Sequence, residues 1–224
     1  MTPPNLASLA ERIIACRRCP RLAAYLDDAR EKHPDYWARP VPGFGDPQAR
    51  LLIVGLAPGY HGANQHGRVF TGDASGQWLW RALFELGVAT QPESRGRDDD
   101  LRLRGVYVSN VVRCVPPQNR PTRGELDTCR SFLCEETALL REVQVVLALG
   151  RIAHDSYLKA RDLGEPLCRR PFAHGARHAL PERPAWLLDC YHPSRQNTNT
   201  GVLTWEMWLE ALGRAVALSR AEEA

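Results

Sequence analysis

The sequence predicts an α/β protein, a three-layer α/β/α sandwich around a central, mostly parallel sheet of about four strands. Short apolar runs rich in β-branched residues alternate along the chain with segments of helical periodicity. This alternation is typical of strand–helix–strand units that build a parallel sheet. In addition, a long Gly-rich stretch directly follows the first apolar run, at the place where open α/β sheets bind their ligands. The hydrophobic content of 44% is ample for a core.

The N-terminal part is predicted to be helical. Apolar residues recur at helical spacing over residues 6–15, and a second helical stretch covers residues 22–31. Residues 36–47 are rich in proline and aromatic residues. This segment either lines a groove or packs along the sheet edge, and the sequence leaves both possibilities open.

The first strand is predicted at Leu51–Val54 and ends at Gly55, before residues 56–76, which we call the site loop. Irregular loops of this length are uncommon in compact domains unless they are functional or disordered. The density of Gly, His, Asn, Arg and Asp favours function. Helical periodicity begins at Gln77, and Ser75 is a plausible N-cap for that helix.

The remaining chain continues the alternation. Polar residues 90–104, with three consecutive aspartates, are predicted to form an exposed loop. Further strands are predicted over residues 106–112, 143–150 and 185–190, and helices over 125–142, from 151 or 152, and over 203–220. Because parallel strands end at one edge of the sheet, we expect the site loop, Asn110 and the segment around His192 to meet there.

Seven cysteines suggest metal or cluster ligation, since disulfides are rare in a reducing cytosol. Cys16 and Cys19 form a C-x2-C turn, typical of half a zinc or iron–sulfur site, although a redox dithiol is the alternative. Further thiolates would come from Cys114 and Cys129, and Cys134 competes with Cys129. Two isolated cysteines are predicted to be buried small apolar residues, namely Cys168 and Cys190.

Charge and hydropathy exclude some classes of protein. No stretch approaches the roughly 20 apolar residues of a membrane helix, and no secretory signal is evident. We therefore expect a cytoplasmic protein without a membrane partner. The net charge of +3 permits nucleic-acid binding but is too small to indicate it alone.

Three motifs resemble those of a uracil-DNA glycosylase, and most closely those of family 5 (type B). They are G-L-A-P-G from Gly55, G-R-V-F-T-G-D-A-S-G from Gly67 and H-P-S-R-Q-N-T-N-T-G from His192. The cysteine pattern resembles that of the 4Fe–4S cluster in families 4 and 5, which implies Cys16, Cys19, Cys114 and Cys129 as ligands. The resemblance spans almost the whole chain.

The resemblance implies a monofunctional DNA glycosylase that hydrolyses the N-glycosidic bond of uracil and of other damaged bases, such as hypoxanthine, to start base excision repair. It implies one domain over residues 1–224, with the N-terminal helix tied on by a structural cluster. The expected partner is damaged DNA, single- or double-stranded, bound by a monomer. Three alternatives remain: a uracil-specific family 4 enzyme, a non-catalytic iron–sulfur DNA-binding module and a zinc protein.

Asp73 is the only acid in the site loop, so we expect it to position water or to stabilise a cationic sugar. Its alternative role is an Asx-turn or N-cap, which Ser75 would otherwise supply. The related families carry a polar or acidic residue where this chain has Leu56 and Ala57, and this difference shifts the acid's role to Asp73. His192 is a candidate donor to uracil O2, or else a buried structural histidine.

Asn110 and Asn119 are rival readers of the base, and Asn119 falls on a family 5 functional position. The resemblance also implies base contacts from Gly55, Leu56, Ala57 and Phe70. Candidate phosphate contacts are Ser75, Gly76, Ser194 and Arg195, together with Arg68 and Arg120. We expect residues 196–201 to enter the minor groove.

Overall fold

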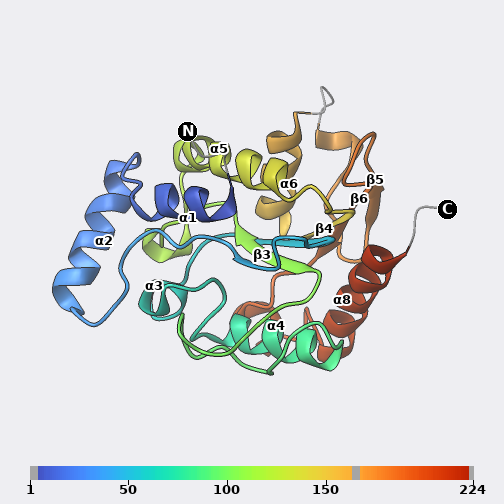
Figure 1. Cartoon of the computed structure of the whole chain (residues 1–224), viewed down its shortest axis with the longest axis horizontal. Coiled ribbons are helices and arrows are strands. Elements are labelled where there is room, and N and C mark those ends of the chain that lie inside the picture. Colours follow the sequence, from blue (N-terminus) through green and yellow to red (C-terminus); the bar gives the residue numbers. More distant parts are fainter. Residues whose placement is uncertain (1–4, 163–166, 222–224) are drawn as a thin grey trace.

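The computed structural model describes residues 5–162 and 167–221 and contains a six-stranded sheet in the order β1-β3-β2-β4-β6-β5 (Figure 1). The four central strands are parallel to one another, and the two edge strands are antiparallel to their neighbours. The strands are β1 Phe44–Gly45, β2 Leu51–Gly55, β3 Val106–Asn110, β4 Val145–Leu149, β5 Arg177–Ala179 and β6 Trp186–Cys190.

The α/β class and the four parallel strands are confirmed, but the expected total of four strands is too low. The missed strands β1 and β5 have only two and three residues, too few to show a period. β1 also shows that part of the segment 36–47 packs along the sheet edge, where Phe44 pairs with Val108.

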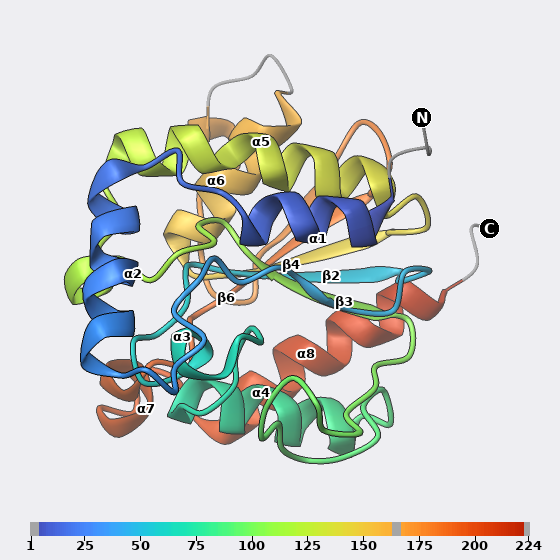
Figure 2. The same ribbon diagram turned by 60° about the vertical axis from the view of Figure 1, so that its left-hand side comes forward.

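Helices cover both faces of the sheet. Figure 2 shows α1, α5 and α6 on one side and α4 and α8 on the other. The helices are α1 Leu6–Ile14, α2 Pro20–Lys32, α3 Ala63–His66, α4 Ala74–Glu85, η1 Pro117–Asn119, α5 Arg123–Leu139, α6 Arg151–Arg161, η2 Leu167–Arg169, α7 Arg195–Asn199 and α8 Trp205–Arg220.

The central strands are rich in apolar residues because helices cover both faces of the sheet. In β2, Leu51 and Ile53 join the core beneath α4 and α8, whereas Leu52 and Val54 join the core beneath α1, α5 and α6. A strand with both faces buried shows no alternation of polar and apolar residues, as expected for a parallel sheet. Within the described part of the chain, no helix is long and apolar enough to cross a membrane.

The end of the sheet at which the central strands finish is flanked by α2 and by two short helices. α2, α3 and α7 lie together at that end of the sheet (Figure 2). α2 is fastened to α5 by an ion pair between Arg21 and Glu125 with an N–O distance of 2.7 Å. α7 lies inside the segment that was expected to be a loop, and its N-cap is Ser194.

Candidate functional site

A cavity of about 580 Å³ opens at the carboxyl ends of β2, β3 and β6. It collects side chains from segments far apart in the sequence, as the topology of parallel strands predicts. The predicted residues that line it are Leu56, Ala57, Phe70, Asp73, Ser75, Asn110, Asn119, His192, Ser194 and Arg195. Gly55 and Gly76 do not line the cavity, but both pack against residues that line it.

Phe70 provides an aromatic wall. Its backbone has a φ of 51°, an uncommon conformation for a bulky residue. α4 holds this conformation, since the Trp80 indole donates to the Phe70 carbonyl at 2.6 Å, and a Cβ at Gly76 would overlap the same carbonyl. The Phe70 and His192 rings are 6.0 Å apart and nearly parallel. Gly76 therefore shapes the wall by permitting close packing.

Asn110 ends β3 with its side chain almost fully buried. Its Oδ1 has no hydrogen-bond partner among the described residues. A Cβ at Gly55 would lie 2.5 Å from that oxygen and 2.6 Å from the Phe70 ring, so only glycine at 55 lets the two groups meet. A buried amide oxygen without a partner at the wall of a cavity can accept a hydrogen bond from a polar ligand.

Asp73 is the N-cap of α4, so the expectation that Ser75 caps this helix is wrong. Oδ1 accepts from the Gly76 N–H at 2.9 Å, and α4 therefore begins at Ala74. Oδ2 lies against the turn of Gly59 and Gly62, where a Cβ would come within 3.0 and 2.5 Å of it. Burial raises the pKa of Asp73, while N–H donors of Gly76 and Ser75 and the charge of Arg195 oppose this shift.

His192 follows β6 and is half-buried in the cavity wall. Burial lowers its pKa to about 4, so the imidazole is neutral at pH 7. No hydrogen bond joins the ring to another residue of the described chain. Its backbone is fixed instead, because the His192 carbonyl accepts from the Asn197 amide at 2.8 Å. The position of the His192 backbone is thus fixed, while the two ring nitrogens have no hydrogen-bond partner within the described chain.

Asn119 reaches the cavity from an unusual backbone conformation. Gln118 and Asn119 both have φ 56°, in the left-handed region that non-glycine residues rarely adopt. Asn119 is exposed and lines the cavity, whereas Asn110 lines it from the buried side. The structure therefore brings both rivals to one cavity, and consecutive strained residues are typical of a functional loop.

The predicted phosphate contacts are of two kinds, namely exposed arginines and polar groups that already have a hydrogen-bond partner. Arg195 and Arg120 are exposed. Ser75 donates its hydroxyl to the Pro193 carbonyl at 2.9 Å, Ser194 accepts from Asn197 N–H at 3.4 Å, and the Gly76 N–H is taken by Asp73. The Ser75 bond joins the site loop to the segment after β6, whereas the other two bonds are helix caps within α7 and α4.

The expected phosphate contact of Arg68 is wrong. Arg68 is buried, pairs with Asp99 and lies over the Phe44 ring at 4.3 Å. Asp99 is accordingly half-buried, although its loop was expected to be exposed. Nothing local in the sequence indicates this pair, because the two residues are thirty-one positions apart.

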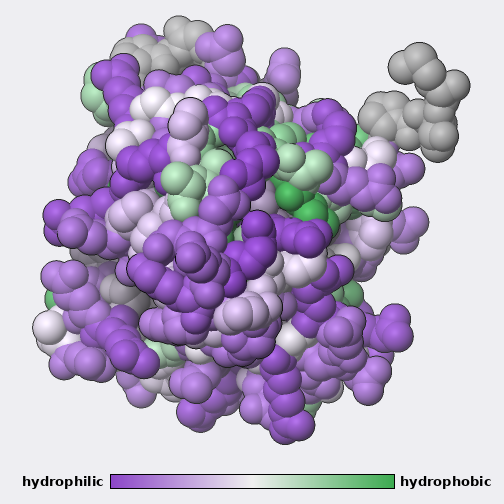
Figure 3. Space-filling view, turned by 90° about the vertical axis from the view of Figure 1, so that its left-hand side faces the viewer, coloured by the Kyte–Doolittle hydropathy of each residue, from purple (hydrophilic) through white to green (hydrophobic). Residues whose placement is uncertain are grey.

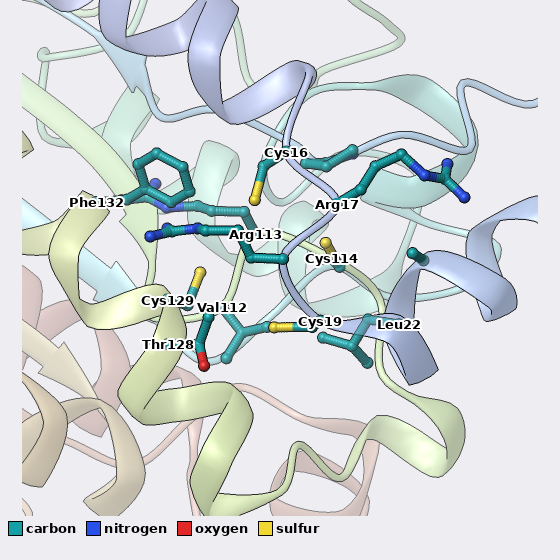
Figure 4. Close-up of a pocket in the computed structure, with 13 residues that line it drawn as sticks. Cys16, Arg17, Cys19, Leu22, Val112, Arg113, Cys114, Thr128, Cys129 and Phe132 are labelled. Carbon is teal, nitrogen blue, oxygen red and sulfur yellow. The ribbon is translucent and has the colours of Figure 1, made fainter.

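A second, enclosed cavity is lined by Cys16, Cys19, Cys114 and Cys129. Figure 4 shows their sulfur atoms around a common space. None of them forms a disulfide. Burial, together with the neighbouring thiols, raises the pKa values of Cys19, Cys114 and Cys129, and four thiols facing one space are a donor set suited to a thiophilic metal or cluster.

The other cysteines are separate from this cavity. Cys134 donates to the Ala160 carbonyl at 3.3 Å, toward α6, which favours Cys129 as the fourth member of the set. Cys190 is buried as predicted. Cys168 was expected to be buried but is exposed, because η2 lies outside the two cores.

Sequence reasoning missed a buried ion pair beside the cysteines. Arg113 Nη2 lies 2.7 Å from Glu136 Oε2, and both side chains are about 1% exposed. Arg113 also donates to Ser109, and its charge and backbone N–H act to lower the pKa of Cys129, against burial. The pair joins the segment after β3 to α5, and Arg113 lines the cavity of the four cysteines. A Glu among helical polar residues carries no signal for such burial.

A second missed network ties β6 to α6 and β5. Asp189 contacts His154 Nδ1 at 2.6 Å and His178 Nε2 at 2.9 Å. These three side chains are close enough to hold a metal ion. However, His154 Nε2 lies 2.7 Å from the Arg170 carbonyl, which only accepts, so both nitrogens of His154 face acceptors. The network is therefore a charge-assisted hydrogen-bond cluster.

Comparison with known proteins gives a consistent result. A family described as the uracil DNA glycosylase superfamily matches residues 42–213. A type-5 uracil-DNA glycosylase of Thermus thermophilus is 49% identical over 217 residues, which is 95% of this chain and 97% of the relative. A type-5 uracil-DNA glycosylase of Pyrobaculum aerophilum is 44% identical, covering 92% of this chain and 90% of the relative. A type-4 uracil-DNA glycosylase of Archaeoglobus fulgidus is 31% identical, covering 71% and 66%.

Proposed function

The chain belongs to the uracil DNA glycosylase superfamily, and we propose that it hydrolyses the N-glycosidic bond of uracil in DNA in the manner of the type-5 enzymes it resembles. The observation that carries this proposal is the cavity, which combines an aromatic wall, an unsatisfied buried amide, a half-buried carboxylate and a neutral imidazole. Each group has a task in releasing a base.

Base recognition begins with extrusion of the nucleotide, because the glycosidic bond is inaccessible inside a duplex. The Phe70 ring offers a face on which the flat uracil stacks. The Asn110 amide is suited to accept from uracil N3–H and donate to O4, which would satisfy its buried oxygen. Asn119 would close over the base from the exposed side.

Bond cleavage develops positive charge on the sugar and negative charge on the leaving uracil. Asp73 would stabilise the sugar cation and orient the attacking water, whose oxygen bonds to C1′ as the C1′–N1 bond breaks. The raised pKa makes this carboxylate a better base, and the hydrogen bond from the Gly76 N–H favours its ionised form. His192, neutral with a pKa of about 4, would donate a hydrogen bond to uracil O2 without carrying a competing charge.

DNA binding would use the exposed rim of the cavity. Arg195 lines the cavity and is exposed, and its charge would meet a phosphate. Gln196 at the start of α7 would enter the space that the flipped base leaves. We propose that the protein acts as a monomer on both single- and double-stranded DNA.

The four-cysteine cavity would hold a 4Fe–4S cluster through Cys16, Cys19, Cys114 and Cys129. Bound there, the cluster supplies a cross-link and takes no part in the hydrolysis. It would tie the N-terminal helix to the loop that carries Asn119, so that the whole chain, residues 1–224, acts as one domain.

The range of bases is proposed to extend to hypoxanthine. Leu56 and Ala57 place no acid or amide at the cavity wall, so few polar groups there would reject a purine. A strictly uracil-specific enzyme would need such a rejecting group.

Release of uracil tests the proposal. A labelled duplex with one G·U pair is incubated with the enzyme and then treated with alkali, which cleaves abasic sites. We expect strand scission by the wild type, and weaker scission on a G·hypoxanthine duplex. Binding without scission would favour the non-catalytic DNA-binding module, and scission of uracil alone would favour a uracil-specific enzyme.

A further inference from the structure

Five aromatic rings form a cluster beside the cavity, which we call the aromatic cluster. Its members are Tyr25, His33, Tyr36, Tyr60 and His61. His33 and Tyr36 stack at 4.4 Å between ring centroids, and Tyr60 meets His61 edge to face at 4.9 Å. A hydrogen bond of 2.7 Å joins the Tyr36 hydroxyl to His61 Nδ1. The rings are thus held in a fixed arrangement.

The aromatic cluster is continuous with the proposed DNA-binding surface. Tyr60 and His61 lie between Gly59 and Ala63, and these two residues line the cavity. The rings are not withdrawn into the core, because His61 is exposed and Tyr36 and Tyr60 are partly exposed. Figure 3 shows that this side of the molecule, which carries α2, is predominantly hydrophilic.

A groove of mixed charge continues the path beyond the rings. Its lining includes two arginines, two aspartates and two aromatic residues, namely Arg39, Arg97, Asp35, Asp98, Tyr36 and Trp37. The guanidinium carbons of Arg39 and Arg97 lie 5.6 and 4.1 Å from the centroid of the Trp37 ring. Both arginines are exposed, and neither forms an ion pair with a residue of the described chain, so their charges are available to phosphates.

Aromatic faces next to exposed arginines are a combination with which proteins bind single-stranded DNA. Bases stack on the rings, and phosphates follow the cations. We propose that the aromatic cluster, with Arg39 and Arg97, binds the unpaired nucleotides next to the flipped base in single-stranded DNA. The inference rests on the proposed function, since it extends the same binding surface. A duplex would keep these bases paired and would gain little from the rings.

The test uses a single-stranded oligonucleotide with one uracil and a 2-aminopurine on either side of it, and the same strand in a duplex. The variants are Tyr36→Leu, Tyr60→Leu and His61→Ala, of which His61 is exposed and safe for folding. Tyr36→Phe keeps the ring and loses only the bond to His61. Phe84→Leu, an exposed ring on α4 outside the cluster, is the matched control.

We expect KM for the single strand to rise about tenfold in the leucine and alanine variants, with kcat unchanged and the duplex nearly unaffected. Quenching of one 2-aminopurine by stacking should be lost in the same variants and kept in Tyr36→Phe and Phe84→Leu. Unchanged KM and quenching in all variants of an active enzyme would overturn the inference and leave the proposed function standing. An equal rise for duplex and single strand would also overturn it, and no excision by wild type would reject the proposed function itself.

Discussion

Asp73 combines a structural role with the chemical role that we propose for it. The sequence left Asp73 as either a helix cap or a catalytic carboxylate, and its position suits both roles. One carboxylate oxygen caps α4 through Gly76, and the other lies against the Gly59–Gly62 turn in the cavity wall. The capping bond fixes the carboxylate in space, which is what an oriented catalytic group requires.

Asn119 and Gln118 allow a matched test of the strained loop. Both have φ 56°, but only Asn119 lines the cavity. Replacing Asn119 with glycine keeps the left-handed backbone and removes the amide, so we expect excision to slow about tenfold, the worth of one hydrogen bond. Gln118→Gly should leave the rate unchanged, and neither change should cost more than about 1 kcal/mol of stability. Equal rates for the two variants in a single-turnover assay would contradict the role of Asn119.

Glu136 and Glu135 are neighbours on α5 with opposite surroundings. Glu136 pairs with Arg113 in the core, whereas Glu135 pairs with Arg12 at the surface. Glu136→Gln leaves a buried guanidinium uncompensated, so we expect the free energy of unfolding to fall by about 3–5 kcal/mol. Glu135→Gln should cost less than about 1 kcal/mol. Urea denaturation of both variants measures the difference, and a loss at Glu136 no larger than at Glu135 would refute it.

Among the helices and strands, those with a clear hydrophobic pattern along the sequence could be predicted. The central strands are five-residue apolar runs, and their order along the chain gave the parallel sheet. The edge strands β1 and β5 could not be predicted, because pairing with a neighbouring strand defines them and their composition does not. The start of α4 was misplaced because a contact distant in sequence decides it. The Ser75 hydroxyl donates to the Pro193 carbonyl and does not cap the helix.

The packing of α6 on β6 contains a pH-dependent contact. Burial alone would lower the pKa of His154, but its bonds to Asp189 and the Arg170 carbonyl raise it above 6.5. His178 and the Ala173 N–H also face Asp189, and Asp155 lies near on α6. The folded protein thus holds a proton more tightly than the unfolded chain, so this stability is full below about pH 6.5 and is lost as pH rises through the raised value.

Thermal melting of wild type and His154→Gln from pH 6 to 8.5 measures this contribution. We expect the wild type to lose stability relative to the variant as pH rises, because only the wild type releases the His154 proton. Parallel curves for the two proteins would show that His154 does not titrate in this range.

At the scale of the whole molecule, the four-cysteine cavity joins three distant parts of the chain. Cys16 and Cys19 connect α1 to α2, Cys114 follows β3, and Cys129 lies on α5. The C-x2-C spacing indicated half of this site from the sequence. The choice of Cys129 over Cys134 needed the structure, because it depends on which side of α5 faces β3 and which faces α6.

Two serine variants on α5 test the assignment of the cluster. Cys129→Ser should lower bound iron and the brown absorbance and should reduce the melting temperature, because a structural metal site contributes folding free energy. Cys134→Ser, whose sulfur faces Ala160, should keep both. Iron analysis of the purified proteins checks this. Equal iron in both variants would contradict the assignment of Cys129 as a ligand. Zinc in place of iron would contradict the iron–sulfur cluster.

Single-turnover excision by Asp73→Asn tests most directly whether this cavity releases uracil with Asp73 as its catalytic carboxylate. Asparagine caps helices as well as aspartate does, so the fold and the binding of DNA should be unchanged. We predict that the variant melts like the wild type and binds a uracil-containing duplex equally, yet excises uracil at least about 100-fold more slowly. Excision by the folded variant at the wild-type rate would contradict the account and leave Asp73 as a helix cap alone.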